Sequence, residues 1–203
     1  MAELSHLHRF EPETEAGRPA VLLLHGTGGD ENDLLLLGRT VAPGSALISP
    51  RGQVLENGAP RFFRRLAEGV FDEADVRHRA NALADFVAQA GEAYGFTSPI
   101  ALGFSNGANI AAAVLMLRPE ALAGAVLLRA MVPLPESPAA GLEGKPVLII
   151  SGAADPIVPA ENAARLAALL AAAGASVSHE ILPAGHNLSQ SDVALAKAWI
   201  GDR

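Results

Sequence analysis

The chain of 203 residues is half hydrophobic, has 22 acidic against 15 basic residues, and carries a net charge of −7. The absence of cysteine excludes disulfides, thiolate metal sites and a cysteine nucleophile, and the negative charge disfavours binding to nucleic acid. No apolar run reaches the ~18 residues of a membrane span, and the N-terminus lacks the pattern of a signal peptide. We therefore expect one domain over residues 1–203, in the cytoplasm and without stable membrane insertion.

Apolar runs alternate with helical patterns along the chain. In order, the expected elements are an edge strand over 4–10, a strand over 20–25, a helix over 33–41, a strand over 46–49, a helix over 75–94, a strand over 99–104, a helix that follows residue 107, strands over 125–128 and 146–151, a helix over 159–173, a strand over 177–182, and a last helix opened by a capping box at Ser189 and Asp192. Residues 51–72 have no clean period and form the longest irregular section. Continuous apolar strands alternating with helices predict an α/β fold, with a mostly parallel central sheet flanked by helices.

The turn Gly103-Phe104-Ser105-Asn106-Gly107 joins an apolar strand to an alanine-rich helix. It matches the G-x-S-x-G nucleophile elbow, in which a serine occupies a strained turn between a strand and a helix. Small flanking residues let the two elements pass closely, and the helix N-terminus favours a developing oxyanion. Ser105 is therefore the candidate nucleophile, although a plain connection between strand and helix would also fit the pattern.

Two further loops at the carboxyl ends of strands carry a candidate acid and a candidate base. Asp155 follows the strand that ends at Ser151, and His186 follows the strand that ends at Leu182. The chain order of serine, aspartate and histidine is that of G-x-S-x-G hydrolases, and one sheet edge could gather all three. Taken singly, Asp155 could simply cap the next helix, and His186 could simply form hydrogen bonds with backbone carbonyls, with no catalytic role for either. Together with Ser105 they predict a catalytic triad.

The glycine-rich turn from His25 to Gly29 follows the early strand over 20–25. Such a turn offers a backbone N–H to an oxyanion, and the residue after the nucleophile, Asn106, offers a second one. A phosphate-binding turn is disfavoured because G-T-G-G-D lacks the lysine of a nucleotide loop. We expect His25 to hold this loop rather than to act as a second base.

These motifs, LLLHGTGGDE, GFSNGANIA, GAADPIVP and the late GH, resemble those of small α/β-hydrolases of the phospholipase/carboxylesterase family, within the dienelactone-hydrolase-like group. The segment RGQVLENGAPRFFRRLAEGVFDE is similar to a bacterial branch of carboxylesterases linked to hydroquinone. The resemblance implies an α/β-hydrolase fold, with Ser105 as nucleophile, His186 as general base and Asp155 as orienting acid. It also implies oxyanion donors at the backbone of Thr27 and Asn106. Acyl-protein thioesterases usually have leucine and glutamine at these last two positions, and dienelactone hydrolases proper use a cysteine nucleophile; both departures weaken the transfer of their substrates to this chain.

Candidate pocket residues come from the irregular segment and from the end of a later strand. The candidate substrate pocket comprises Phe62, Phe63, Leu66, Phe71, Met131 and Val132. The alternative is that these aromatic residues only anchor a long loop onto the core. Arg64 and Arg65 could hold an acidic substrate group or form a solvated face. The short chain leaves little room for a helical lid, so we expect an open site with minimal or no lid.

The sequence as a whole predicts a serine carboxylesterase that hydrolyses small or medium carboxylic esters through an acyl-enzyme intermediate. We expect no metal and no cofactor, and a small-molecule ester as the partner. A thioesterase or lactone hydrolase with the same triad is one alternative, and a ligand-binding protein with an unproductive triad is another. A homodimer is compatible with an apolar surface beside an open site, although no sequence feature establishes it.

Overall fold

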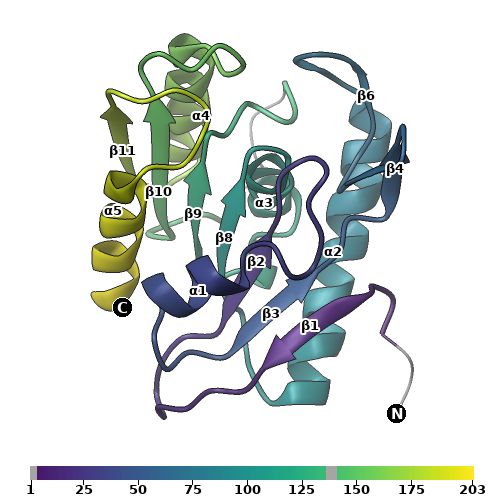
Figure 1. The fold of residues 1–203 in the computed structure, drawn as a ribbon, viewed down its shortest axis with the longest axis vertical. Coiled ribbons are helices and arrows are strands. Elements are labelled where there is room, and N and C mark those ends of the chain that lie inside the picture. The colour runs from purple at the N-terminus through teal and green to yellow at the C-terminus, as the bar shows by residue number, and fades with distance from the viewer. Residues whose placement is uncertain (1–3, 136–140) are drawn as a thin grey trace.

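The computed structural model describes residues 4–135 and 141–203. Its main sheet has seven strands in the order β1-β3-β2-β8-β9-β10-β11, and every pairing is parallel except that of the edge strand β1 with β3 (Figure 1). The strands of this sheet are β1 (His8–Glu11), β2 (Val21–Leu24), β3 (Leu47–Pro50), β8 (Ile100–Phe104), β9 (Gly124–Leu128), β10 (Pro146–Gly152) and β11 (Ser176–Leu182). The predicted mostly parallel sheet is therefore confirmed.

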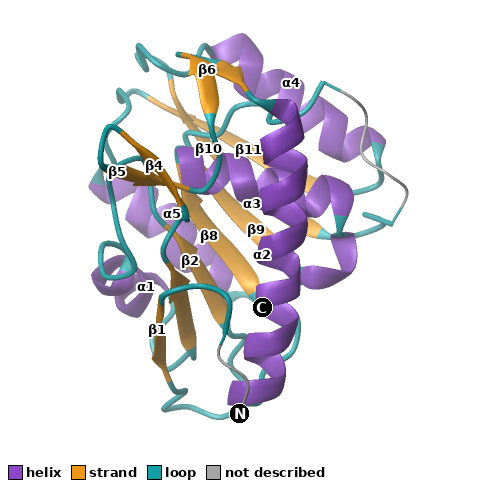
Figure 2. Ribbon diagram, turned by 90° about the vertical axis from the view of Figure 1, so that its right-hand side faces the viewer, coloured by secondary structure: helices purple, strands orange, loops and turns teal. Residues whose placement is uncertain are grey.

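Helices cover both faces of this sheet. They are α1 (Leu35–Val41), α2 (Glu73–Tyr94), α3 (Asn106–Leu117), α4 (Ala160–Ala172) and α5 (Gln190–Gly201), with a short 3-10 turn over Pro119–Ala121. One buried cluster packs α2, α3 and α4 against one face, and a second packs α1 and α5 against the other. Figure 2 shows α2 running along the molecule beside α3. Within residues 4–135 and 141–203, no helix is long and apolar enough to cross a lipid bilayer.

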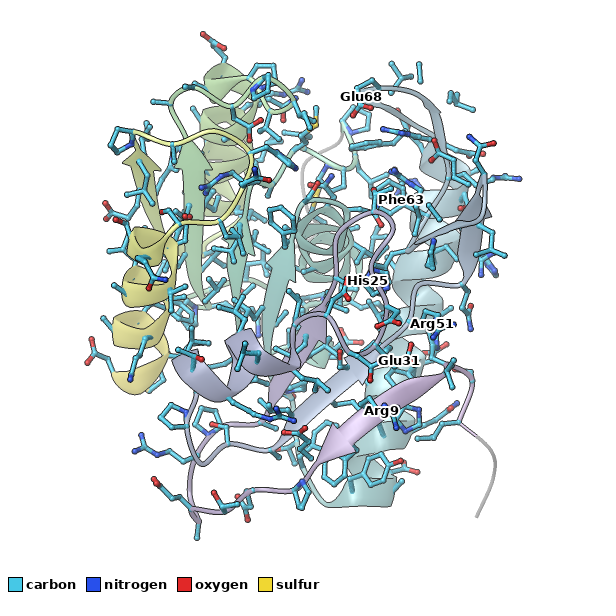
Figure 3. All side chains as sticks on the ribbon, viewed as in Figure 1. Arg9, His25, Glu31, Arg51, Phe63 and Glu68 are labelled. Atoms are coloured by element: carbon cyan, nitrogen blue, oxygen red, sulfur yellow. The ribbon has the colours of Figure 1, made fainter. Side chains whose placement is uncertain are left out.

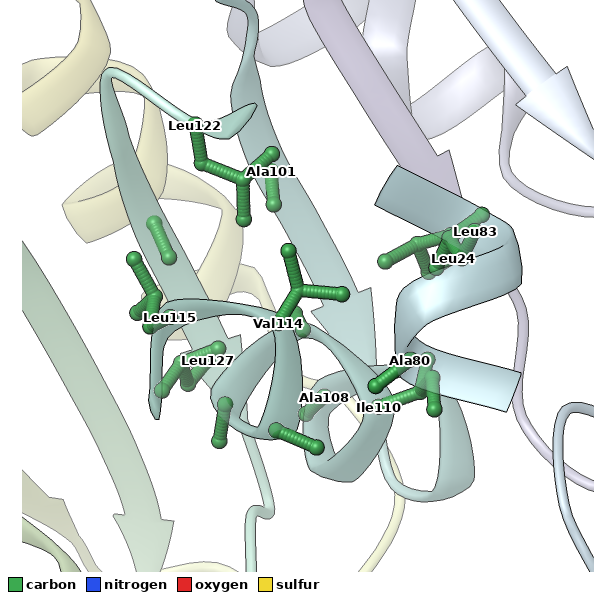
Figure 4. Close-up of a cluster of buried hydrophobic side chains, with 14 of the residues drawn as sticks. Leu24, Ala80, Leu83, Ala101, Ala108, Ile110, Val114, Leu115, Leu122 and Leu127 are labelled. Carbon is green, nitrogen blue, oxygen red and sulfur yellow. The ribbon is translucent and has the colours of Figure 1, made fainter. Parts of the chain in front are cut away.

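The helix α3 lies in the interior of the protein, between the sheet and α2. Its residues from Asn106 to Met116 are all buried, as expected for a helix that is apolar on every side. Figure 4 shows Ile110 and Val114 of this helix among side chains from β2, β8, β9 and α2. The N-terminus of α3 is consequently fixed at the carboxyl edge of the sheet.

Gly107 lets α3 approach β2 closely at this edge. A Cβ at Gly107 would overlap the carbonyl oxygen of Leu24 and lie 2.6 Å from that of His25, and these backbone atoms cannot move aside cheaply. We expect Gly107→Ala to lower the free energy of unfolding by about 2 kcal/mol or more, measured by urea titration. Gly201→Ala is the matched control, because no atom lies within 4 Å of its added Cβ. Equal stability of the two variants would contradict this account of the close approach.

The segment 51–72 contains two short hairpins, which corrects the expected irregular section. β4 (Val54–Glu56) pairs with β5 (Ala59–Arg61), and β6 (Arg65–Ala67) pairs with β7 (Val70–Phe71). Strands of two or three residues are too short to show an alternating pattern, so periodicity could not reveal them. The first hairpin turns at Asn57-Gly58, both with positive φ, as a type I′ turn requires. Both hairpins lie at the upper right of Figure 1, near the end to which the parallel strands point.

Candidate active site

Ser105 occupies the sharp turn between β8 and α3. Its backbone has φ of +52° and ψ of −114°, a conformation that costs free energy in a residue other than glycine. The turn is held because the N–H of Ser105 donates to the carbonyl oxygen of Leu128 on β9 (2.8 Å), and its own carbonyl accepts from the N–H of Asn109 (2.9 Å). The serine hydroxyl is thereby fixed at the carboxyl edge of the sheet.

The structure brings Ser105, His186 and Asp155 into one hydrogen-bonded chain. His186 Nε2 lies 3.0 Å from Ser105 Oγ, and His186 Nδ1 lies 2.8 Å from Asp155 Oδ2. The Asp155 side chain has no exposed surface, and that of His186 is 17% exposed. Since an ionised carboxylate can only accept, Nδ1 carries the proton and Nε2 is free to accept from the serine hydroxyl.

The second carboxylate oxygen of Asp155 binds the backbone of its own loop. Oδ1 accepts from the N–H groups of Ile157 (2.8 Å) and Val158 (3.0 Å). Burial raises the pKa of Asp155, but these two N–H groups and His186 outweigh burial and leave the pKa below its ordinary value. The sequence left open whether Asp155 bonds its local backbone or orients His186. In the structure it makes both contacts, each through a different carboxylate oxygen.

Two backbone N–H groups, on the loops that follow β2 and β8, form no hydrogen bond among the described residues. Asn106 is the first residue of α3, where a backbone N–H has no partner within the helix. No hydrogen-bond acceptor for the N–H of Thr27 or Asn106 is found among residues 4–135 and 141–203. The oxyanion role expected for these two groups stays a prediction.

The loop that carries Thr27 is attached to the first hairpin of the 51–72 segment. Arg61 Nη1 donates to Thr27 Oγ1 (2.7 Å), and the N–H of Gly28 donates to the carbonyl of Pro60 (2.9 Å). Arg61 is buried, which lowers its pKa, and its guanidinium also lies 3.2 Å from a carboxylate oxygen of Glu56. The sequence did not identify Arg61 as part of this arrangement.

His25, which is labelled in Figure 3, forms a hydrogen bond with the backbone through each of its two ring nitrogens. Nδ1 lies 2.7 Å from the carbonyl oxygen of Gly26, to which it donates, and Nε2 accepts from the N–H of Gly52 at 2.9 Å. Burial lowers the pKa of His25, which favours the neutral ring that this pair of bonds requires. The expected structural role of His25 agrees with these contacts.

Three asparagine side chains fasten the segments around Ser105 to one another. Asn106 Oδ1 accepts from the N–H of Phe62 (2.7 Å), so the first turn of α3 holds the 51–72 segment. The other two bind the backbone after β9. Asn109 Oδ1 accepts from the N–H of Met131 (2.7 Å), and Asn162 Oδ1 accepts from the N–H of Val132 (2.8 Å).

Removal of the Asn106 side chain tests the attachment of the 51–72 segment. Asn106→Ala leaves its own backbone N–H in place but deprives the N–H of Phe62 of a buried acceptor. We expect a loss of about 1–3 kcal/mol in the free energy of unfolding, measured by urea titration. Asn81→Ala is the control, because that side chain is exposed on α2, and we expect a change within about 0.5 kcal/mol. A similar change in both variants would argue against the attachment.

The candidate pocket residues lie in three different environments. Phe62 and Phe63 are buried in the main core, which favours the anchoring interpretation for these two rings. Leu66 is 72% exposed on the second hairpin. Met131, Val158 and Ala163 form a small apolar cluster, Phe71 packs against both this cluster and the main core, and Val132 is partly buried beside Met131.

Arg64 and Arg65 both take part in ion pairs within their own segment. Arg64 Nη2 lies 2.8 Å from Asp72, while Arg65 lies 2.9 Å from Glu56 and also pairs with Glu68. These contacts give both arginines a role in the structure of the hairpins. Among the residues that the structure describes, no group of three His, Asp or Glu side chains is arranged to hold a metal ion.

The chain resembles known proteins over nearly its whole length. A model of the Phospholipase/Carboxylesterase family matches residues 8–201. "Putative hydrolase MhqD" of Bacillus subtilis (strain 168) is 46% identical over 194 residues, which cover 95% of this chain and 96% of that protein. The crystal structure of a Bacillus cereus carboxylesterase matches with a TM-score of 0.95 and 44% identity, over 98% of this chain and 94% of that one.

A carboxylesterase from Mesorhizobium loti matches the complete chain, with 100% of this chain and 98% of that one covered, a TM-score of 0.93 and 32% identity. The mostly parallel sheet flanked by helices and these close structural matches show the α/β-hydrolase fold. The family match across nearly the whole chain leads to one conclusion: the protein belongs to the phospholipase/carboxylesterase family.

Proposed function

We propose that the protein is a serine carboxylesterase in which Ser105 is the nucleophile, His186 the general base and Asp155 the residue that orients the base. The observation that carries this proposal is the continuous chain of hydrogen bonds, 3.0 Å from the serine hydroxyl to the imidazole and 2.8 Å from the imidazole to the carboxylate. A serine hydroxyl becomes a strong nucleophile only when a base so placed takes its proton.

In the acylation step, Ser105 Oγ forms a bond to the ester carbonyl carbon while its proton moves to His186 Nε2. The carbonyl oxygen becomes an oxyanion, which accepts hydrogen bonds from the N–H groups of Thr27 and Asn106. The intermediate then collapses, the bond from carbon to the alcohol oxygen breaks, and His186 gives its proton to the departing alcohol. Asp155 stays ionised and stabilises the imidazolium that forms in between.

In the deacylation step, His186 accepts a proton from a water molecule as the water oxygen attacks the acyl carbon. The same two N–H groups hold the second oxyanion. The bond from the acyl carbon to Ser105 Oγ breaks, the proton on His186 returns to the serine, and a carboxylic acid leaves. The cycle consumes one water and needs no metal or cofactor.

An apolar ester fits the surroundings of the site. Phe71, Met131 and Val158 come from three different segments and form one apolar cluster on the carboxyl side of the sheet. The tip of the second hairpin reaches the same place, since a Cβ at Gly69 would lie 3.6 Å from the Met131 methyl group. The matched Bacillus cereus and Mesorhizobium loti proteins are both called carboxylesterases, which supports an ester as the substrate. The location in the cytoplasm and the homodimer stay predictions.

The proposal is tested by intact-mass analysis after treatment with a fluorophosphonate. We expect one adduct on the wild-type protein and none on Ser105→Ala. A folded wild-type protein that forms no adduct would overturn the proposal and favour a ligand-binding role. The values of kcat/KM are then compared for an ester, a thioester and a lactone with matched acyl groups. The ester is expected to give the highest value.

A further inference from the structure

Arg129 lies directly after β9 and its side chain is completely buried. Its φ of +57° is uncommon for a residue other than glycine. The backbone N–H of Arg129 donates to the carbonyl oxygen of Ile150 on β10, at 2.9 Å. A buried arginine in this conformation is unfavourable unless its contacts compensate, so those contacts indicate what the residue does.

The guanidinium of Arg129 binds the loop that carries His186 on both sides of the histidine. Nε donates to the carbonyl oxygen of Gly185 at 2.9 Å, and Nη2 donates to that of Asn187 at 3.3 Å. Nη1 donates to the carbonyl oxygen of Ile150 at 3.2 Å. The backbone immediately before and after the histidine is thus held by one planar group anchored between β9 and β10.

Asp192 fixes the orientation of this guanidinium. Its two carboxylate oxygens lie 2.7 Å from Nη1 and 3.0 Å from Nη2 of Arg129. Asp192 Oδ2 also accepts from the backbone N–H and the hydroxyl of Ser189, both at 2.7 Å, in the capping box that opens α5. Burial raises the pKa of Asp192, but the bonds from Arg129 and Ser189 outweigh burial and bring the pKa below its ordinary value, so the carboxylate is charged.

Stability alone does not account for a buried ion pair of this kind. Apolar side chains of similar volume often stabilise a protein as well as a buried ion pair does, because both charges lose their hydration. Apolar side chains cannot, however, bind three backbone carbonyls and a carboxylate at once, as this single planar group does. The nucleophile is attached at the same place, since the N–H of Ser105 donates to the carbonyl oxygen of Leu128, the residue before Arg129.

We propose that Arg129, oriented by Asp192, is a positioning residue that holds His186 Nε2 within hydrogen-bond distance of Ser105 Oγ. This inference rests on the proposed function, because it assigns to the ion pair the geometry of the proposed base and nucleophile. Arg129 does not touch the substrate. It acts on the reaction through the backbone on either side of His186.

The test uses a double variant, Arg129→Met with Asp192→Asn, which removes both charges while the asparagine still accepts from the Ser189 N–H. We expect a folded protein in which kcat for an ester falls about 10²-fold and KM stays within about twofold, since small displacements of a catalytic group have effects of this size. The downfield proton resonance of the His186 Nδ1–H should shift or broaden. Arg129→Lys should show the same pattern, because one ammonium cannot replace the planar fork.

Arg118→Met is the control, because it breaks ion pairs with Asp85 and Glu120 at the surface and should leave kcat unchanged. Wild-type kcat in the folded double variant, or in Arg129→Lys where the double variant does not fold, would overturn the inference. That outcome differs from failure of the proposed function, in which the wild-type protein itself would neither hydrolyse esters nor react with a fluorophosphonate.

Discussion

Ser105→Ala is expected to lower kcat for ester hydrolysis by at least about 10³-fold, because within residues 4–135 and 141–203 Ser105 carries the only hydroxyl that is hydrogen-bonded to His186. The fold should persist, since alanine keeps the backbone N–H that donates to the carbonyl oxygen of Leu128. The measurement is the initial rate with an activated ester, together with thermal unfolding of both proteins. A variant that hydrolyses the ester at the wild-type rate would rule out Ser105 as the nucleophile.

Ser151→Ala provides a matched control for this substitution. Ser151 Oγ lies 2.7 Å from His179 Nε2, another contact between a serine and a histidine, but Ser151 is buried at the β10–β11 pairing. Ser151→Ala should therefore leave kcat within about twofold of wild type. A further variant, Ser105→Gly, should lose activity and gain up to about 1 kcal/mol of stability, because glycine relieves the strain of the positive φ.

Asp155→Asn is expected to lower kcat about 10⁴-fold by fixing the wrong tautomer of His186. The oxygen that replaces Oδ1 continues to accept from the N–H groups of Ile157 and Val158, so the new NH2 group must occupy the place of Oδ2. There it donates to His186 Nδ1, and the ring proton moves to Nε2, which can no longer accept from the serine. Steady-state kinetics on a folded variant measure the effect.

Asp85→Asn makes the same chemical change on the surface and should leave kcat unaltered.

Acid unfolding gives a second measurement. Because the pKa of Asp155 is lowered in the folded protein, its carboxylate contributes stability above the ordinary pKa of an aspartate, and this contribution is lost as the pH falls through the lowered value. Asp155→Asn should therefore lose less stability on acidification than wild type does. Equal acid sensitivity of the two proteins would show that the pKa of Asp155 is not lowered.

The strands, the main helices and the relation of Ser105 to His186 and Asp155 could be expected from local patterns. Each of these residues lies within four positions of the end of a strand, and parallel strands bring their carboxyl ends to the same edge. The glycine-rich turn at residues 26–29 could also be expected, because it directly follows the apolar strand over residues 20–25. Local pattern therefore predicted the features that depend on one strand and the turn that follows it.

Features that depend on partners distant in sequence were not predicted. Arg129 follows an apolar strand just as Asp155 does, but nothing in its neighbourhood indicates that Asp192, 63 residues later, would pair with it. Arg61 is one of several arginines in the 51–72 segment, and only the hairpin places it against Thr27. The hairpins themselves were missed because their strands are too short for a period, although Asn57-Gly58 is a recognisable hairpin turn.

The manner in which the 51–72 segment is fastened bears on how the protein can change during evolution. Its attachments to the scaffold include Asn106, Arg61, and the bond from the N–H of Gly52 to His25, whereas Leu66 and the other large apolar side chains at the hairpin surface are exposed. Exposed positions of this kind tolerate replacement at little cost in stability. The surface of the two hairpins can thus acquire new side chains, while the hydrogen bonds that hold the segment to α3 and to the loop after β2 stay in place.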